Sequence, residues 1–367
     1  MKGSQSSAKV VVSHTAARAI FAEVQRWVDH GLADGGMPLE SMIYPLSALV
    51  PRDAVFRCPL ELASVEHISE IVIDGAAVPP DEVKAFSPHN CHFAAEDIDQ
   101  ASAAFNEAID RALAERPRLA VNSKLHSHPF SGGKFLSSGD LRHGVSAPAA
   151  LAWRERRGLG TAILHVVHPD GDPLPCPAPW TIDAEGAVAK APGQRAVRWR
   201  ISTWASVGHS GAAGLGSIDA PQMQDLGEAR IVGDDYDAVQ ASRRPTYWQT
   251  THGAAWCDAQ KAALRSAGYK VSRNVLGRGW RRYLVEAGTR TVLIALPPDF
   301  PHAPLRALEV RRAWANDFAP LSPPPGSAGG DGTRIGNCSL LKLARYFGPP
   351  TQRAAGAAGV AGAQPSA

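Results

Sequence analysis

The chain has few of the features that mark secreted or membrane-embedded proteins. Its five cysteines are scattered, odd in number and form no C-x-x-C pair, so we expect neither a disulfide framework nor a cysteine-based zinc site. No apolar run approaches the roughly 18 residues of a transmembrane helix, and the first residues show no signal-peptide pattern. These absences predict a cytoplasmic protein with no membrane partner.

The chain also has little excess of positive over negative charge, since the formal net charge is only +3 over 367 residues. Such a balance gives no whole-chain preference for nucleic acid, which is not an expected partner. One stretch differs: residues 260–315 hold eleven Lys and Arg against three Asp and Glu, a net charge of eight. A solvated surface explains this stretch, and the alternatives are an acidic partner or nucleic acid.

The first half of the chain alternates strand and helix patterns. Helical spacing of apolar residues over residues 14–30, with Ser13 or Thr15 as its cap, predicts a helix behind a short strand. A second helix is predicted over 97–117, and strands over 41–50, 66–75, 118–128 and 160–169. This order predicts an α/β or α+β domain over residues 1–185.

The second half divides into three predicted parts. Residues 186–235 are irregular and Gly-rich, and we interpret them as a linker or covering segment. Residues 236–318 predict a smaller α+β unit, with a helix over 256–269 and a three-stranded meander over 270–297. Residues 319–367 are rich in Pro, Gly and Ala and are expected to be a largely disordered tail, with a short amphipathic helix over 338–347.

Two histidines, His126 and His128, lie one residue apart at the end of a predicted strand. Side chains on a strand alternate between faces, so both imidazoles can reach one metal ion. Asp140 follows the Pro/Gly-containing loop of residues 129–135 and begins a predicted helix, where it can supply a third ligand. Three His and carboxylate ligands leave one tetrahedral position open, as in catalytic zinc sites. The pattern predicts a Zn²⁺ site.

The stretch H-S-H-P, a short loop and F-L-S-S-G-D resembles the JAMM motif of the JAB/MPN metalloproteases. The family pattern has seven residues between the second histidine and the serine, whereas this chain has eight between His128 and Ser137. The spacing from Ser137 to Asp140 is kept, and one extra residue in a surface loop costs little. The resemblance covers about residues 9–180 and implies a JAB/MPN-type sheet flanked by helices.

The resemblance also implies a glutamate near the first helix that activates the zinc-bound water. Glu40 in "PLESMIYPLSAL" occupies that place, although Ile43 and Ser47 stand where the family has glycines. Rival carboxylates on later segments are Glu61, Glu66 and Glu70. In the implied mechanism Glu40 is the general base and acid, and Ser137 stabilises the oxyanion.

The implied activity is zinc-dependent hydrolysis of the peptide or isopeptide bond after a ubiquitin-like protein. The implied partners are that protein or its conjugate, and ubiquitin-activation-like or conjugating-like enzymes. The order of elements in residues 236–318 is similar to a ubiquitin-conjugating or RWD-like fold without a cysteine at the catalytic position. The alternative function is a non-catalytic MPN-type scaffold, or a DNA-associated JAB protein that uses this basic unit.

Four further signals have plainer explanations. His89, Cys91 and His92 fit a turn-rich loop better than a second ligand set, and His143 fits a helix surface. The "GHSGA" stretch of residues 208–212 nearly matches a serine-hydrolase elbow, but no strand clearly precedes it. The "GAAGLG" stretch has glycines in the wrong order for a dinucleotide site.

Overall fold

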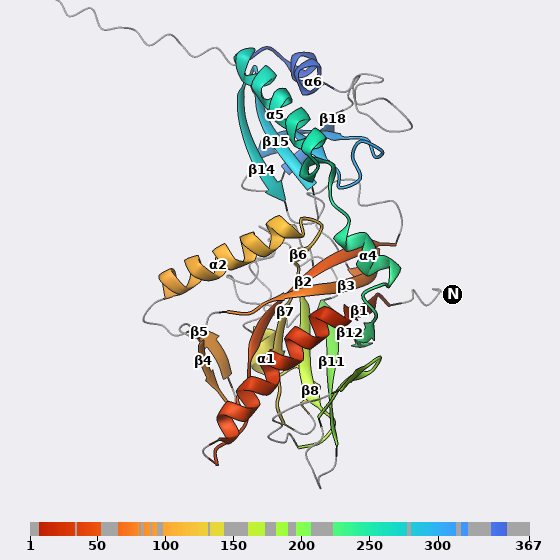
Figure 1. Cartoon of the computed structure of the whole chain (residues 1–367). Coiled ribbons are helices and arrows are strands. Elements are labelled where there is room, and N and C mark those ends of the chain that lie inside the picture. The colour runs from red at the N-terminus through yellow and green to blue at the C-terminus, as the bar shows by residue number, and fades with distance from the viewer. Residues whose placement is uncertain are drawn as a thin grey trace, which may run out of the picture. The chain divides into compact units, whose positions relative to one another are not determined.

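The computed structural model describes most of the chain and divides it into two units (Figure 1). The described residues are 7–33, 35–52, 65–79, 81, 84–88, 90–93, 98–130, 133–142, 161–172, 181–189, 196–206, 223–276, 280–312, 317–321 and 339–350. Unit 1 runs to Pro245, and unit 2 begins at Thr246. Both units combine helices with strands, so the predicted mixed α and β class is confirmed at that level.

Unit 1 is built on one large mixed sheet. Its strands pair in the order β13-β1-β3-β2-β7-β8-β11-β10-β9, with β12 on β11 and β6 on β2. The strands are β1 (Lys9–Ser13), β2 (Met42–Pro51), β3 (Ile68–Ala77), β6 (Ala120–Val121), β7 (Lys124–Ser127), β8 (Ile163–Pro169), β9 (Thr181–Asp183), β10 (Gly186–Ala189), β11 (Val197–Ser206), β12 (Met223–Glu228) and β13 (Arg230–Val232). A separate hairpin is formed by β4 (Lys84–Ser87) and β5 (Asn90–Phe93).

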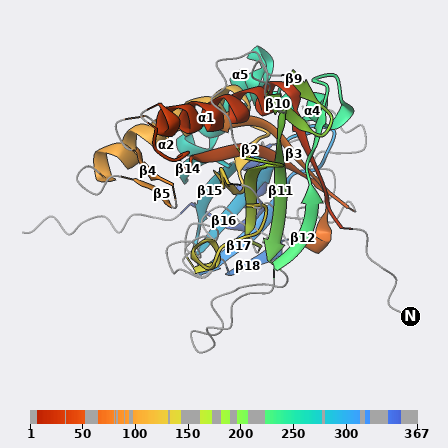
Figure 2. The same cartoon turned by 90° about the horizontal axis from the view of Figure 1, so that it is seen from below.

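Helix α1 (His14–Leu32) covers one face of this sheet, as Figure 2 shows. The predicted cap is confirmed, since the Ser13 hydroxyl accepts a hydrogen bond from the Ala16 N–H at 3.1 Å. Ile20, Phe21 and Val24 recur at helical spacing and are buried in a core with strand residues such as Ile71. Burying each such side chain contributes about 1.5–3 kcal/mol, so this stripe holds α1 on the sheet.

The opposite face is covered by helices α2 (Ile98–Glu115) and α4 (Asp237–Arg243). Strand side chains alternate between faces, so Val72 packs with Val239 of α4, whereas its neighbours Ile71 and Ile73 pack with the α1 core. Phe105 of α2 packs in a separate cluster with Tyr44 of β2. Strand β2 is therefore packed on both faces, with Ile43 in the α1 core and Tyr44 in the α2 cluster, and it supports β7 through their pairing.

The interpretation of residues 186–235 as a linker or covering segment is wrong. Their described residues form strands β10 to β13, and β13 pairs with β1 in parallel. Unit 1 therefore extends past residue 185, to Pro245. The alternation of Val197, Trp199 and Ile201, all buried, explains why this segment folds into the sheet.

Unit 2 is an antiparallel meander with helices against it. The elements are η5 (Tyr247–Gln249), α5 (Thr251–Ser266), β14 (Lys270–Leu276), β15 (Trp280–Ala287), β16 (Arg290–Leu296), β17 (Arg306–Arg312), β18 (Asp317–Leu321) and α6 (Leu340–Phe347). The predicted helix and three-stranded meander are confirmed, and two further strands extend the sheet. Leu340, Leu343 and Ala344 of α6 are buried in the core of this unit. The part of the predicted tail that the structure describes is thus folded.

A short 3₁₀ turn, η1 (Val65–His67), precedes β3. Among the described helices, none combines the length and the apolar character needed to cross a membrane.

Candidate metal centre

The two histidines lie at the end of β7, between β2 and β8. His126 is opposite Met42 in the antiparallel pairing with β2, and the His128 N–H donates to the Val167 carbonyl of β8 at 2.8 Å. Hydrogen bonds on both sides fix the backbone that carries the imidazoles. The strand predicted over residues 118–128 is divided into β6 and β7, and His128 follows the end of β7 directly.

His126, His128 and Asp140 come together as a group that can hold a metal ion. The two Nε2 atoms are 2.9 Å apart, His126 Nε2 is 3.0 Å from Asp140 Oδ1, and His128 Nε2 is 3.4 Å from Asp140 Oδ2. All three side chains are largely buried, with exposed fractions of 11%, 12% and 16%. The structure thus brings together the three residues that the motif selected.

The spacing of these ligand atoms fits a small tetrahedral cation. Zinc–ligand bonds of about 2.0–2.1 Å place neighbouring ligand atoms of a tetrahedral site about 3.3 Å apart. The three separations, 2.9, 3.0 and 3.4 Å, scatter around that value. Two imidazoles and one carboxylate also match the ligand preferences of zinc, although other divalent metals accept the same set.

The orientation of the His128 ring is set from its other side. Its Nδ1 atom is 2.7 Å from the Gly133 carbonyl oxygen, so the Nδ1–H donates there and the Nε2 lone pair faces the cluster. A Cβ atom at Gly133 would lie 2.6 Å from the His128 Cβ atom, which is closer than real Cβ contacts come. Glycine at residue 133 is therefore required for the loop to reach His128.

Ser137 and Asp140 begin a helical turn over residues 138–142, as predicted for Asp140. The Ser137 hydroxyl accepts from the Asp140 N–H at 3.1 Å, and the Ser137 N–H donates to Asp140 Oδ2 at 2.6 Å. This reciprocal pair is a capping box, with Asp140 in the place of the usual Glu or Gln. It fixes the Asp140 carboxylate toward the histidines. Ser137 itself is exposed, and its hydroxyl hydrogen is free to donate elsewhere.

Glu40 lies half-buried just before β2 and acts electrostatically on the cluster. Burial raises the pKa of its carboxyl to about 7, while His128 opposes the rise and Asp140 adds to it. The Glu40 N–H donates to the Ser87 carbonyl of β4 at 3.0 Å, which holds the segment in place. A carboxyl group with a pKa near 7 is suited to both accept and return a proton at neutral pH.

The charges within the cluster also shift the pKa values of Asp140 and His128. Burial raises the pKa of Asp140, but its hydrogen bonds with His126 and His128 outweigh burial and hold that pKa well below its usual range. Burial lowers the pKa of His128, yet the hydrogen bond and charge of Asp140 raise it above its ordinary value. The carboxylate is therefore ionised, as metal binding requires.

The rivals to Glu40 have other surroundings. Glu66 is exposed in η1, and Glu70 accepts a hydrogen bond of 2.8 Å from the Tyr236 hydroxyl. Cys91 and His92 belong to β5 of the hairpin, so their segment is a strand rather than a loop. Several other candidates lie outside the described residues: Glu61, His89, His143 and residues 208–216.

Sequence reasoning missed a third histidine, His165 on β8. It is fully buried, with Nδ1 2.8 Å from the Thr203 hydroxyl and Nε2 2.9 Å from the Ser123 hydroxyl. Burial lowers the pKa of this imidazole to about 3, and the charge of His126 adds to the lowering. His165 therefore stays neutral and ties β8 to β11 and to Ser123, just ahead of strand β7, which carries His126. No pattern in the sequence indicates this role for His165.

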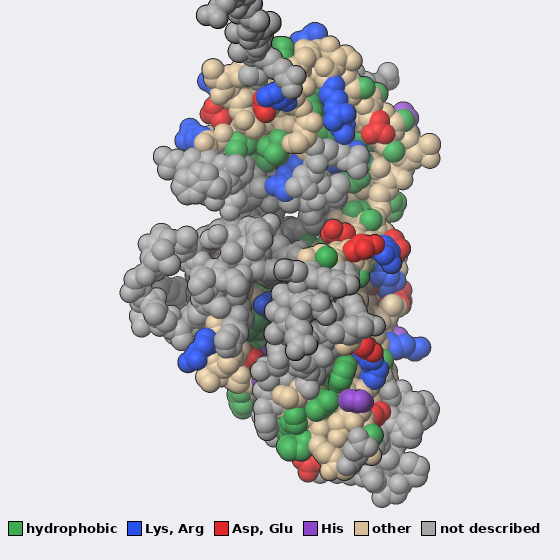
Figure 3. Space-filling view, turned by 90° about the vertical axis from the view of Figure 1, so that its left-hand side faces the viewer, with side chains coloured by type: hydrophobic (Ala, Val, Ile, Leu, Met, Phe, Trp, Pro, Cys, Tyr) green, Lys and Arg blue, Asp and Glu red, His purple; other side chains and the backbone are tan. Residues whose placement is uncertain are grey.

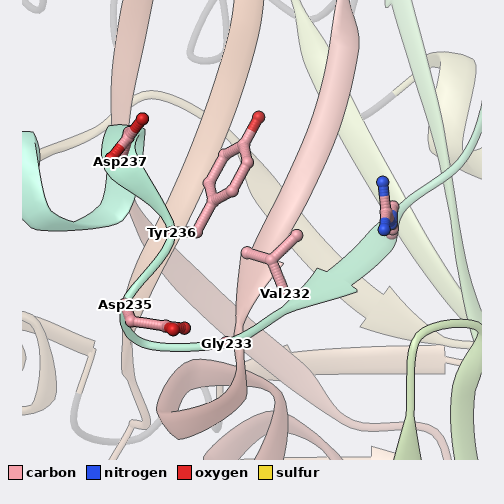
Figure 4. A pocket seen from close by; sticks show the side chains of 6 residues that line it. Val232, Gly233, Asp235, Tyr236 and Asp237 are labelled. Atoms are coloured by element: carbon pink, nitrogen blue, oxygen red, sulfur yellow. The ribbon is translucent and has the colours of Figure 1, made fainter.

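An open pocket of about 360 Å³ lies elsewhere in unit 1, after β13. Figure 4 shows Asp235, Tyr236 and Asp237 following Val232 and Gly233 along its wall. None of its lining residues belongs to the metal-ligand group. The chemistry of the described residues therefore points to β7 rather than to this pocket.

Comparison with known proteins adds no family to these findings. No protein-family model matches the chain, and no curated protein matches it significantly.

Proposed function

We propose that the protein is a zinc-dependent hydrolase of peptide or isopeptide bonds, with a JAB/MPN-type fold in unit 1. The observation that carries the proposal is the convergence of His126, His128 and Asp140 beside the half-buried Glu40. A scaffold without chemistry has no need for three ligand atoms within 4.8 Å of one another next to a carboxyl group whose pKa is raised to about 7.

Each residue has a part in the proposed reaction. His126, His128 and Asp140 hold the zinc ion, which when bound polarises the substrate carbonyl and lowers the pKa of water. Glu40 accepts the proton of the attacking water and later delivers it to the leaving amine. The exposed Ser137 hydroxyl donates a hydrogen bond to the carbonyl oxygen as negative charge develops on it.

The proposed substrate is a ubiquitin-like protein joined through its C-terminus to an amine. This part rests on the resemblance of H-S-H-P and F-L-S-S-G-D to the JAMM motif. Ubiquitin-activation-like and conjugating-like enzymes are the proposed partners, since they make the conjugates that such a hydrolase cleaves. Unit 2 is proposed as the recognition module.

The test uses ubiquitin and a panel of ubiquitin-like proteins, each carrying a fluorogenic amide at its C-terminal carboxyl group. We expect hydrolysis that a chelator abolishes and zinc restores. Glu40→Gln should lower the rate by about 100-fold or more and keep its zinc, because a general base contributes about 10²–10⁴. Glu66→Gln, at an exposed glutamate in η1, is the matched control. A Glu40→Gln protein as active as the parent would remove Glu40 from the reaction.

The alternative of a DNA-associated protein has weaker support. Within the basic stretch, Lys270 pairs with Glu286 at 2.9 Å and Arg290 pairs with Glu309 at 3.3 Å. On the face shown in Figure 3, the described Lys and Arg side chains do not merge into one continuous patch. DNA binding that weakens steeply with salt would favour this alternative.

A further inference from the structure

The serine between the two histidines, Ser127, makes an unusual contact with the segment that carries Glu40. The register of β2 on β7 sets Met42 opposite His126, and the residue before Met42, Ser41, is hydrogen-bonded to Ser127. Ser41 and Ser127 are both fully buried. This serine pair therefore joins the segment that carries Glu40 to the strand that carries His126.

The pairing at this point departs from a regular antiparallel ladder. The Ser127 N–H donates to the Ser41 carbonyl at 2.9 Å, as expected for a hydrogen-bonded pair. The return bond is different, because the Ser41 N–H donates to the Ser127 side-chain Oγ at 2.8 Å rather than to a backbone carbonyl. The hydroxyl takes the place of a ladder acceptor, and the two hydroxyl oxygens also lie 3.2 Å apart.

This substitution has a geometric consequence for Glu40. Directly opposite residues in an unbroken ladder have Cβ atoms about 4.5–5.5 Å apart, which leaves little room for a water molecule between a carboxylate and an imidazole. Here the ladder ends at Ser41, and the Glu40 N–H turns to the Ser87 carbonyl instead. The Ser127 hydroxyl therefore holds the backbone at Ser41, the residue after Glu40, at the point where the chain leaves its pairing with β7.

We infer that Ser127 is a positioning residue, whose hydroxyl sets the offset between the Glu40 carboxylate and the group of His126, His128 and Asp140. Ser127 does not touch the substrate in this assignment. It acts through the backbone of Ser41, and the inference rests on the proposed function only in giving Glu40 a role.

The chain offers a matched pair of variants. Ser127→Ala removes the acceptor of the Ser41 N–H, whereas Ser41→Ala removes a buried hydroxyl from the same pair and keeps both backbone groups. Ser127→Thr keeps the acceptor and should restore the behaviour of the parent. The decision rests on the two alanine variants, which add no volume to the core.

The first readout is amide hydrogen exchange of the metal-free, full-length protein. Ser127→Ala should speed exchange at Ser41 by about tenfold, because a lost hydrogen bond of about 1.4 kcal/mol corresponds to that factor. Ser41→Ala should leave exchange at its own residue 41 within about threefold. Unchanged exchange at Ser41 in Ser127→Ala would overturn the assignment.

The second readout is the broadening of the Glu40 carboxyl ¹³C resonance by bound Co²⁺, assigned by its loss in Glu40→Gln. Paramagnetic broadening falls steeply with distance, so Ser127→Ala should lose most of it and Ser41→Ala should keep it. Broadening equal to that of the parent in Ser127→Ala would refute the inference. A parent that binds no Co²⁺ would instead refute the metal site, and amide exchange would then decide the role of Ser127 alone.

Discussion

The Arg243 guanidinium donates hydrogen bonds of 2.6 and 2.8 Å to the two carboxylate oxygens of Asp74, which is fully buried. This bidentate pair joins α4 to β3, and Arg116 approaches the same carboxylate at 3.3 Å. A buried carboxylate that loses a partner keeps its desolvation cost. The pair therefore holds the end of unit 1 against the sheet.

Replacing Arg243 should destabilise the protein. We expect Arg243→Met to lower the free energy of unfolding by about 2–4 kcal/mol, because the buried Asp74 carboxylate would lose its bidentate partner and keep only weaker contacts with Arg116 and Ser242 among the described residues. Arg244→Met, at the exposed neighbouring arginine, is the control and should change stability by less than about 0.5 kcal/mol. Urea unfolding measures both. Equal stabilities of the two variants would show that the pair contributes nothing.

Metal content should depend on Asp140. We expect about one zinc ion per chain in the parent, measured by elemental mass spectrometry, and a large loss in Asp140→Asn. The amide oxygen of Asn can still accept from the Ser137 N–H, so this variant keeps the helix cap while losing the charge. Asp110→Asn, at an exposed residue of α2, should retain the metal. Equal zinc in all three proteins would place the ion elsewhere.

Glu40 should titrate near neutrality in the metal-free protein. Burial raises the pKa of this carboxyl to about 7, so its ¹³C resonance should shift with a midpoint near pH 7. A bound cation favours the ionised carboxylate, and zinc should therefore move that midpoint to lower pH. A midpoint near 4.5, the ordinary value, in the metal-free protein would contradict the burial of Glu40.

The buried His165 should make the protein sensitive to acid. Its pKa is lowered from 6.5 to about 3. Between these two pH values the unfolded chain therefore binds a proton at this imidazole and the folded chain does not. Stability is therefore lost as the pH falls, by about 2 kcal/mol at pH 5 from this group alone.

The measurement is urea unfolding of the parent and of His165→Gln at pH 7.5 and at pH 5. Gln also offers one donor and one acceptor for the Ser123 and Thr203 hydroxyls, but it does not titrate. The variant should lose less stability than the parent between the two pH values. Identical pH dependence would mean that His165 is not the group responsible.

Ser137 should serve both the helix and the reaction. Ser137→Ala removes the acceptor of the Asp140 N–H, which costs about 1 kcal/mol of stability, and it also removes the proposed oxyanion donor. We expect hydrolysis to fall by about 10²–10³ with zinc retained, as for other oxyanion donors. Ser138→Ala, at the adjacent exposed serine, should keep full activity. A Ser137→Ala enzyme with the parent's rate would leave Ser137 only its capping role.

The sequence predicts the parts of the site that lie close together along the chain. His126, His128, Ser137 and Asp140 fall within fifteen residues, where strand alternation and a capped helix determine their directions. Glu40 was selected by resemblance, and the structure places it within the electrostatic reach of His128 and Asp140. The order of residues in the motif therefore predicts most of the candidate metal site.

What the sequence did not predict depends on contacts between distant segments. The pairing of Ser41 with Ser127 spans 86 residues, and the bond of His165 to Thr203 spans 38. The short strands β12 and β13 carry little apolar alternation, and they form because β11 and β1 offer them partners. A single sequence contains no signal for the partners of β12 and β13, and the alternation within β11 alone did not indicate that residues 186–235 belong to the sheet.

The capping box fixes the number of residues between Ser137 and Asp140 for two separate reasons. The three-residue step between them is required by the first turn of the helix and again by the direction of the carboxylate toward the histidines. The loop before it is fixed at Gly133 by the His128 ring, while residues 134–136 between Gly133 and Ser137 carry neither demand. Leu136 packs against Ala162 and Leu164, whereas Lys134 and Phe135 are exposed, so residues 134–135 are the place where an extra residue would disturb neither the helix cap nor the contact with His128.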